Sequence, residues 1–228
     1  MKQIKNLTKK AAVAAVLIIV MVFSGCSKLT IYSGYKEPDN IIVIRTLGID
    51  YENGKISVTG CTGVGLEGTA PMIFTAEGAS LAEAVAGMTK GYMRQEPIFS
   101  HTEHILIGSK AAERGIGSFL DYVARDVDMR LSTNIFILKD GTAKDAITKC
   151  AGETTSTADM LTAIKSEAPE VGEGYVYTCE EVMSALAGKG CAIIQAVSIK
   201  DSPELSAEAK KEGEEVKSVE PDGFAIIR

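Results

Sequence analysis

The sequence lacks the short motifs by which many active sites are recognised. It contains no GxSxG, P-loop, HExxH or CxxC motif, no tryptophan and only two histidines. A GxG pair at Gly63 and Gly65 is not followed by the start of a helix, so it does not predict a nucleotide site. Glu180 and Glu181 are adjacent on an expected helix, where they are solvated rather than paired for catalysis. We therefore predict no catalytic residue, no metal site and no cofactor.

A hydrophobic run long enough to cross a bilayer is also missing near the N-terminus. The apolar run Ala11–Phe23 has 13 residues, whereas a spanning helix needs about 20. It follows four lysines, Lys2, Lys5, Lys9 and Lys10, and no acidic residue. A basic region followed by a short apolar region is typical of a secretory signal peptide.

The apolar run ends in Phe23, Ser24, Gly25 and Cys26, which together resemble the lipobox of bacterial lipoproteins. In such proteins the chain is cut before the cysteine, whose thiol carries a diacylglycerol, and further acyl chains such as palmitate strengthen the anchor. Phe23 departs from the pattern, in which leucine is usual. The alternatives are an ordinary cleaved signal and an uncleaved anchor. We expect residues 1–25 to be the lipoprotein signal peptide, Cys26 to be lipidated, and residues 26–39 to be a tether on the extracytoplasmic face of a membrane.

Positive charge is scarce in the rest of the chain. Removal of residues 1–25 from the 228-residue chain leaves 203 residues, with 20 basic and 30 acidic side chains and a net charge of −10. An acidic surface repels phosphate groups, so nucleic acid is not an expected partner. Lipid rather than charge would therefore hold the protein at the membrane.

Four cysteines follow the lipobox, namely Cys61, Cys150, Cys179 and Cys191. Export permits disulfides, and four cysteines allow three pairings. A domain of this size can be stable without disulfides, and free cysteine often packs as a small apolar side chain. We expect buried, unpaired thiols, with the disulfide pairings as the alternative.

Strands and helices alternate over residues 40–150. Ile41–Ile49 and Ile56–Cys61 flank an Asn53-Gly54 pair and predict a β-hairpin. Further strands are expected at Met72–Glu77, Ile105–Ile107 and Asn134–Leu138, and helices are expected to start at Ser80, Lys110, Ser118 and Thr142. The alternation predicts an α/β (α+β) fold, with a mixed β-sheet surrounded by helices.

The periodicity is weaker after Cys150. We expect helices at 154–165 and 179–187, separated by a Gly/Glu/Pro-rich stretch at 167–174, and a strand at 191–199. Residues 201–217 are rich in charge and predict a solvated helix or linker. Pro221-Asp222-Gly223 is expected to turn into a terminal strand, which either adds to the sheet or starts a second, incomplete domain. We place the N-terminal domain at 40–200 and the linker with the start of a second domain at 201–228.

The two histidines, His101 and His104, precede the strand Ile105–Ile107. On a helix they would share a face and could bind a metal ion, whereas on a strand they point to opposite sides. We expect one histidine to be hydrogen-bonded at the start of the strand and the other to be exposed.

A charged cluster, Arg125, Asp126, Asp128 and Arg130, lies between an expected helix and an expected strand. We expect it to form ion pairs that fix this connection rather than a binding site, because exposed ion pairs are common and individually weak.

Several segments, taken in order, resemble one protein family. They are Ile42–Tyr51 with Asn53–Lys55, Thr75–Ala84, Ser100-His101, Ile105–Gly108, Gly115-Ile116, Phe119–Asp121, Arg125-Asp126, Arg130-Leu131 and Lys144–Ile147. Their order and spacing, after a lipobox, are similar to those of the Ger(x)C family, the lipoprotein C subunits of spore germinant receptors. The likeness covers residues 40–150 well and 150–228 loosely. The tryptophan that members often carry after the lipid cysteine is missing, and His104 stands where members have an aliphatic residue.

The resemblance implies the N-terminal domain of a multi-domain lipoprotein that acts in the nutrient germinant receptor. Its expected partners are two membrane-embedded receptor subunits, and its expected location is the spore inner membrane. The resemblance implies no enzymatic activity, and no catalytic residue is carried over. The alternatives are a solute-binding lipoprotein of a transporter, which would need two lobes and a polar cleft, and a lipid-anchored envelope hydrolase, which the missing motifs disfavour.

Overall fold

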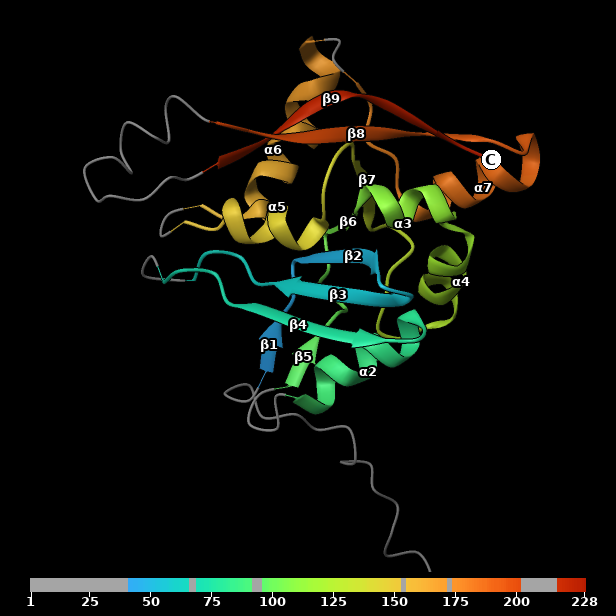
Figure 1. Ribbon diagram of the computed structural model, residues 1–228. Helices are drawn as coiled ribbons and strands as arrows, with labels where there is room; N and C mark the ends of the chain where they lie inside the picture. The colour runs from blue at the N-terminus through green and yellow to red at the C-terminus, as the bar shows by residue number, and fades with distance from the viewer. Residues whose placement is uncertain (1–40, 66–68, 92–95, 153–154, 172–173, 202–216) are drawn as a thin grey trace, which may run out of the picture. The chain divides into compact units, whose positions relative to one another are not determined.

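A seven-stranded mixed sheet is the centre of the structure, a computed structural model that describes residues 41–65, 69–91, 96–152, 155–171, 174–201 and 217–228 (Figure 1). In spatial order its strands are β4 (Ile73–Gly78), β3 (Lys55–Cys61), β2 (Thr46–Glu52), β6 (His104–Ile107), β7 (Asn134–Leu138), β8 (Ala192–Asp201) and β9 (Lys217–Ile227). The strands β2, β6, β7 and β8 are parallel to one another, while β3, β4 and β9 are antiparallel to their neighbours. The predicted α/β fold with a mixed sheet is confirmed.

The predicted hairpin is formed by β2 and β3. Asn53 and Gly54 have φ values of 52° and 81°, the left-handed pair that a two-residue turn between twisted antiparallel strands requires. The expected continuous strand at 41–49 is divided, however. Ile41–Val43 forms β1, which pairs in parallel with β5 (Glu96–Ile98) in a separate two-stranded sheet. The division lies at Ile44 and Arg45, where the Arg45 side chain forms ion pairs outside the sheet.

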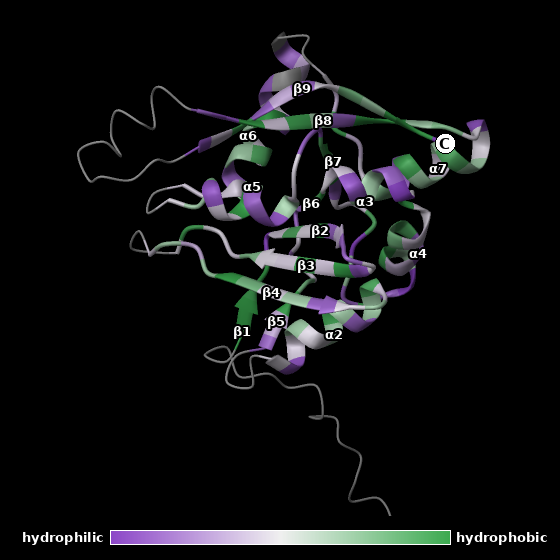
Figure 2. Ribbon diagram, viewed as in Figure 1, coloured by the Kyte–Doolittle hydropathy of each residue, from purple (hydrophilic) through white to green (hydrophobic). Residues whose placement is uncertain are grey.

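Helices cover both faces of the sheet. One face packs against α2 (Leu81–Gly91), α3 (Ser109–Arg114), α4 (Gly117–Arg125) and α7 (Cys179–Lys189), and the other packs against α5 (Ala143–Lys149) and α6 (Thr157–Val171). In β6 and β7, successive side chains enter the two cores alternately, so every residue of both strands is buried. After His104 and Asn134 at their starts, these strands therefore read as apolar runs, whereas the helices carry mixed hydrophilic and hydrophobic residues (Figure 2).

The starts of α2 and α5 follow the predicted capping residues, whereas α3 and α4 each start one residue earlier than expected and have no side-chain cap. Ser80 Oγ accepts a hydrogen bond from the Glu83 amide at 3.2 Å, and the Glu83 carboxylate accepts one from the Ala79 amide at 2.8 Å. In α5, Thr142 Oγ1 accepts a hydrogen bond from the Asp145 amide at 3.0 Å. These bonds satisfy amides that have no partner inside the helix.

The Asp50 carboxylate adds a second cap to α5 from the middle of the sheet. Its two oxygens accept hydrogen bonds from the amides of Ala143 and Lys144, at 2.7 and 2.9 Å. Asp50 is buried, and a Cβ atom at Gly108 would overlap its carboxylate. The absence of a side chain at position 108 therefore leaves room for this link between β2 and α5.

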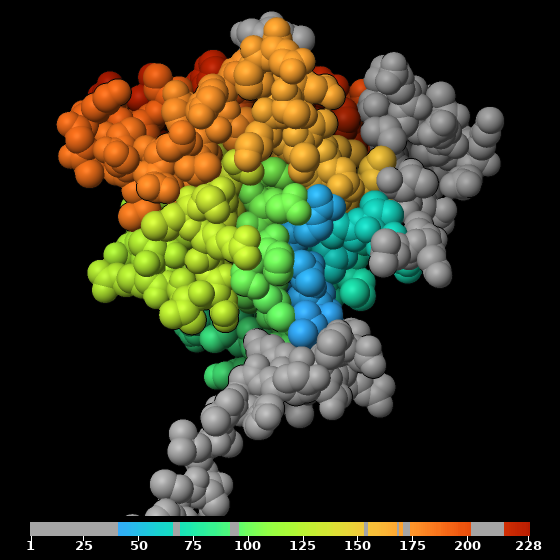
Figure 3. Space-filling view, turned by 180° about the vertical axis from the view of Figure 1, so that it is seen from behind, coloured from blue at the N-terminus to red at the C-terminus, as the bar shows by residue number. Residues whose placement is uncertain are grey.

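The expected interruption at 167–174 begins later than predicted, because α6 continues to Val171 with Pro169 in its last turn, and α7 starts at Cys179. Leu161 and Ile164 anchor this helix in the core. Pro169 has no N–H to donate to the Lys165 carbonyl one turn earlier, and the helix ends two residues after it. Seen from behind, residues 155–171 and 174–201 cover the upper part of the domain, and β9 appears at its upper margin (Figure 3).

The expected turn at Pro221-Asp222-Gly223 is also wrong. These residues lie within β9, which pairs with β8 from Ala192 to Asp201 and has an irregularity opposite Gln195 and Val197. Gly223 has a φ of 77°, which a residue without Cβ adopts easily, and its carbonyl accepts a hydrogen bond from Gln195 Nε2 at 3.0 Å. Of the two alternatives for the terminal strand, the structure shows addition to the sheet. The charged stretch 202–216 lies outside the described residues, and the division into domains stays a prediction.

Candidate functional site

The lipobox lies outside the part of the chain that the structure describes. Phe23, Ser24, Gly25 and Cys26 belong to residues 1–40, so lipidation at Cys26 stays a prediction. Among the described helices, none combines the length and hydropathy needed to cross a membrane. Within the same ranges, no group of three or more histidine, cysteine, aspartate or glutamate side chains is placed to hold a metal ion.

An exposed apolar surface lies at the end of the β8–β9 ladder. Ile193 of β8 is 50% exposed, and Phe224 and Ile226 of β9 are 51% and 65% exposed. Ile193 and Ile226 are cross-strand partners, and Phe224 lies two residues before Ile226 on the same side of β9. We call these three residues the β9 surface. Contiguous exposed apolar side chains of this kind mark protein contact sites more often than isolated ones do.

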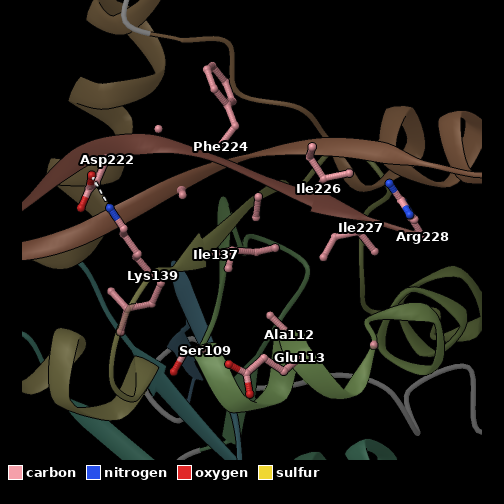
Figure 4. A pocket seen from close by; sticks show the side chains of 15 residues that line it. Ser109, Ala112, Glu113, Ile137, Lys139, Asp222, Phe224, Ile226, Ile227 and Arg228 are labelled. Carbon is pink, nitrogen blue, oxygen red and sulfur yellow. Dashed lines mark hydrogen bonds and ion pairs between the residues drawn. The ribbon is translucent and has the colours of Figure 1, made fainter.

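A groove of 630 Å³ lies on the opposite side of β9. Its apolar lining includes Ile137 of β7, Ala112 of α3 and Ile227 of β9. Figure 4 shows Ile137 and Ile227 pointing into the space between α3 and β9, while Phe224 points away from it. An ion pair between Lys139 Nζ and Asp222 Oδ1, at 3.0 Å, closes one end. Both sides of β9 therefore present apolar side chains at an edge of the sheet.

A second, polar site lies where β6 and β7 begin. These parallel strands place His104 beside Asn134, and both side chains are buried toward α6. Asn134 Nδ2 donates hydrogen bonds to the Glu103 carbonyl at 3.0 Å and to His104 Nδ1 at 3.3 Å. The other imidazole nitrogen, Nε2, lies 2.9 Å from Thr162 Oγ1, which donates its own hydrogen to the Ala158 carbonyl.

This network fixes the protonation of His104. Nδ1 accepts a hydrogen bond and Nε2 donates one, so the imidazole is neutral with its hydrogen on Nε2. Burial of the ring, with smaller contributions from the Lys165 and Arg45 charges, lowers the pKa of His104 to about 4. His104 therefore serves as a neutral connector between β7 and α6.

An ion-pair network adjoins this polar site. The Arg45 guanidinium binds both carboxylate oxygens of Glu103, through Nε at 2.9 Å and through the second terminal nitrogen at 3.0 Å. Its remaining nitrogen binds Asp159 Oδ1 at 2.8 Å. The hydrogen bonds from Arg45 hold the pKa of Glu103 below its usual range. Arg45 thus joins the start of β2 to the residue before β6 and to the first turn of α6.

A family model described as "Spore germination protein N-terminal domain" matches residues 34–199. The chain belongs to this family. The resemblance drawn from the sequence is confirmed, and the family gives the protein a role in spore germination. The matched residues include the polar site and end within β8, before β9 begins. No curated protein and no solved structure matches the chain.

The histidines of this germination domain lie as expected. His104 is buried and hydrogen-bonded at the start of β6, and His101 is exposed. The Arg45 network was not predicted, although an arginine within the apolar run Ile41–Ile49 was a signal that could have pointed to it.

The expected ion pairs of the cluster from Arg125 to Arg130 are wrong. Arg125 Nε binds Asp121 Oδ1 at 2.9 Å, one helical turn earlier, and Asp126 Oδ1 accepts a hydrogen bond from the Asp128 amide. Residues four apart lie on the same face of a helix, so Arg125 pairs with Asp121 and not with Asp126, which follows it in the sequence. Arg130 instead lines the polar site.

The structure places the adjacent glutamates and the four cysteines that the sequence analysis named. Glu181 forms a capping box with Thr178 at the start of α7, beside Glu180. Among the described cysteines all four are unpaired, and burial raises the pKa of the Cys61, Cys150 and Cys179 thiols to about 12. The expectation of buried, unpaired thiols is confirmed for these three residues and wrong for Cys191, which is unpaired but exposed.

Proposed function

We propose that this germination protein is a lipid-anchored, non-enzymatic subunit of a nutrient germinant receptor and acts through protein contacts. The partners would be two membrane-embedded receptor subunits, on the extracytoplasmic side of the spore inner membrane. The observation that carries the proposal is the family match over residues 34–199. The apolar β9 surface and the lipobox pattern at Cys26 are consistent with it.

The anchor is tested by replacing the thiol that would carry the lipid. In spores that express Cys26→Ser, we expect the protein to lose labelled palmitate and to leave the membrane fraction, because the acyl chains would supply its membrane affinity. Cys191→Ser is the matched control, since Cys191 is an exposed cysteine far along the chain. Unchanged fractionation of Cys26→Ser would refute lipid anchoring.

The contact surface is tested by a charge placed on β9. We expect Phe224→Asp to reduce co-purification of the two membrane subunits and to slow germination in nutrient, because a buried unpaired charge at a contact is costly. Val127→Asp is the control, since Val127 is 97% exposed on the loop between α4 and β7. If the Phe224→Asp and Val127→Asp variants co-purify the membrane subunits equally well, the β9 surface is not the contact site.

A solute-binding role predicts a different outcome. In a thermal-shift screen of the full chain against amino acids and sugars, a solute-binding lipoprotein would be stabilised strongly by its solute. A large rise in the melting temperature with one of these compounds, in the absence of any membrane subunit, would favour the transporter alternative.

A further inference from the structure

The outer edge of β9 has no strand beside it within the described ranges. β9 is the last strand of the sheet, and its ladder partner is β8. Backbone N–H and C=O groups on the outer side of such a strand form a template to which a further strand can be added. The other edge strand, β4, differs, because none of the large exposed apolar side chains of the described chain lies in Ile73–Gly78. At β9, strand addition would also cover apolar side chains.

The two halves of β9 differ in how well they are protected against such addition. The first half has three charged residues and a proline, which has no N–H to donate, namely Lys217, Glu220, Asp222 and Pro221. A bulge follows at Gly223, where the pairing with β8 is irregular and φ is 77°. Charges, prolines and bulges are the features by which natural sheets protect their edges. Phe224–Ile227 has none of them.

The side chains that follow the bulge alternate between the two faces of the sheet. Phe224 and Ile226 are exposed on one face. Ala225 and Ile227 belong to the other face, where they are partly buried against the larger core, and Figure 4 shows Ile227 pointing toward the groove. A strand added beside this part of β9 would therefore gain apolar contacts on both faces. We call Phe224–Arg228 the edge segment.

We propose that the edge segment pairs in antiparallel orientation with the edge segment of a second copy of the chain. Such a pair is symmetric about a two-fold axis, so the residues of one segment must complement the same residues in reverse order. Pairing that uses the whole segment and leaves out the bulge has its axis at Ile226. In this register Ile226 lies opposite its own counterpart. Ala225 then lies opposite Ile227, and Phe224 lies opposite Arg228.

This register brings compatible side chains together. Cross-strand pairs of aliphatic side chains stabilise a sheet, and a guanidinium group is attracted to the face of an aromatic ring. No like charges meet, because Arg228 is the one charged residue of the edge segment. The segment thus complements itself, which favours a second copy over a strand of another protein. The inference concerns the chain alone and does not depend on the proposed receptor function.

Association is measured on the full chain without any membrane subunit. The protein is purified in neutral detergent with micelles in excess, at about 0.15 M salt, which screens the repulsion between two chains of net charge −6. We expect light scattering to show a rise from one chain per particle to two as the concentration increases through the micromolar range. We expect hydrogen exchange at the amides of the edge segment to slow in parallel, because pairing protects the outward N–H groups.

Charge variants at Ile226 test the two-fold axis. Ile226→Lys and Ile226→Glu each place like charges opposite each other and remove an apolar contact, so each should weaken the dimer by about ten-fold or more. A mixture of the two variants should dimerise again, because a lysine then faces a glutamate. Ile226 is 65% exposed, so both variants should fold, which circular dichroism checks.

Ile193→Lys is the matched control for these variants. Ile193 is the cross-strand partner of Ile226 and is 50% exposed on the same face, but it lies on β8, one strand farther from the proposed axis. The control should therefore dimerise as the unaltered chain does. If the β9 surfaces of two copies instead stacked face to face, Ile193→Lys and Ile226→Lys would weaken the dimer equally.

Four results would overturn the proposal. The first is one chain per particle at every concentration, without slowed exchange in the edge segment. The second is the equal loss in Ile193→Lys and Ile226→Lys that stacked faces predict. The third is failure of the mixed Ile226 variants to dimerise, which would exclude an axis at this residue. The fourth is a dimer that persists in Ile226→Lys, which would place the contact elsewhere, for example at the apolar run Ala11–Phe23.

Discussion

The central strands and β9 belong to the same sheet but differ in how they are covered. β6 and β7 have a strand on each side and helices on both faces, and all of their residues are buried. β9 pairs with β8 alone among the described strands, and Val219 is its buried residue. We infer that β6 and β7 provide stability, whereas β9 leaves apolar side chains available for another molecule. The inference is tested by pairs of substitutions at residues of the same type, one inside the domain and one at its surface or on β9.

The largest expected effect comes from the two phenylalanines Phe136 and Phe224. Phe136 is completely buried in β7, so Phe136→Ala should lower the free energy of unfolding by about 3–5 kcal/mol through lost burial and a cavity. Phe224→Ala on β9 should change it by less than about 0.5 kcal/mol. Urea denaturation followed by circular dichroism measures both values. Similar losses would contradict the contrast between the strands.

The next effect is a dependence on pH that His104 causes. Because the pKa of His104 falls from 6.5 to about 4 on folding, the folded protein binds fewer protons than the unfolded chain between these values. The free energy of unfolding should therefore decrease as the pH is lowered through this range, by about 3 kcal/mol from this residue. Denaturation at pH 7 and pH 4 should show a smaller decrease in His104→Gln than in the unaltered protein. His101→Gln, at an exposed histidine, should retain the full decrease.

A smaller effect is expected from the carboxylates Asp50 and Asp222. Asp50→Ala removes the acceptor of two α5 amides and should cost about 2 kcal/mol of stability. Asp222→Ala removes an exposed ion pair with Lys139 and should cost less than about 1 kcal/mol. Thermal or urea unfolding compares the two. A larger loss at Asp222 would mean that β9 contributes more to the fold than its exposure indicates.

The smallest effect separates two glycines at which an added Cβ atom would contact no neighbouring atom. Gly223→Ala should destabilise the protein by about 1 kcal/mol, because its φ of 77° strains any residue with a Cβ atom. Gly188→Ala within α7 should instead be neutral or stabilising by up to about 1 kcal/mol, since alanine favours the helix. We expect the unfolding midpoint to fall in Gly223→Ala and to stay the same or rise in Gly188→Ala. A fall in neither variant, or an equal fall in both, would contradict the bulge geometry of β9.

The sequence was most informative where local patterns agree with the fold. The apolar runs of β6 and β7 and the Asn53-Gly54 turn predicted their elements nearly to the residue, because burial on both faces and a left-handed turn each require particular residue types. Thr142 likewise predicted the start of α5. In these cases the physical cause lies within a few neighbouring residues.

Prediction failed where the deciding partner is distant in the sequence. The division between β1 and β2 depends on Arg45 reaching Glu103 and Asp159, 58 and 114 residues away. Pro221–Gly223 has the composition of a turn, but pairing with β8 and the hydrogen bond from Gln195 keep it in a strand. The polar site at the start of β6 and β7 was missed for the same reason, since its residues come from separate elements that local periodicity does not bring together.

The accessibility of Cys191 makes it a chemical reporter for the neighbouring surface. It directly precedes Ala192, which pairs with Ile227 at the end of β9, and it is the exposed thiol among the described cysteines. A maleimide reagent should modify Cys191 rapidly and spare the three buried thiols, whose high pKa values keep them protonated. The labelling rate of this one natural side chain can thus show, without any engineered probe, when a second molecule shields that end of the sheet.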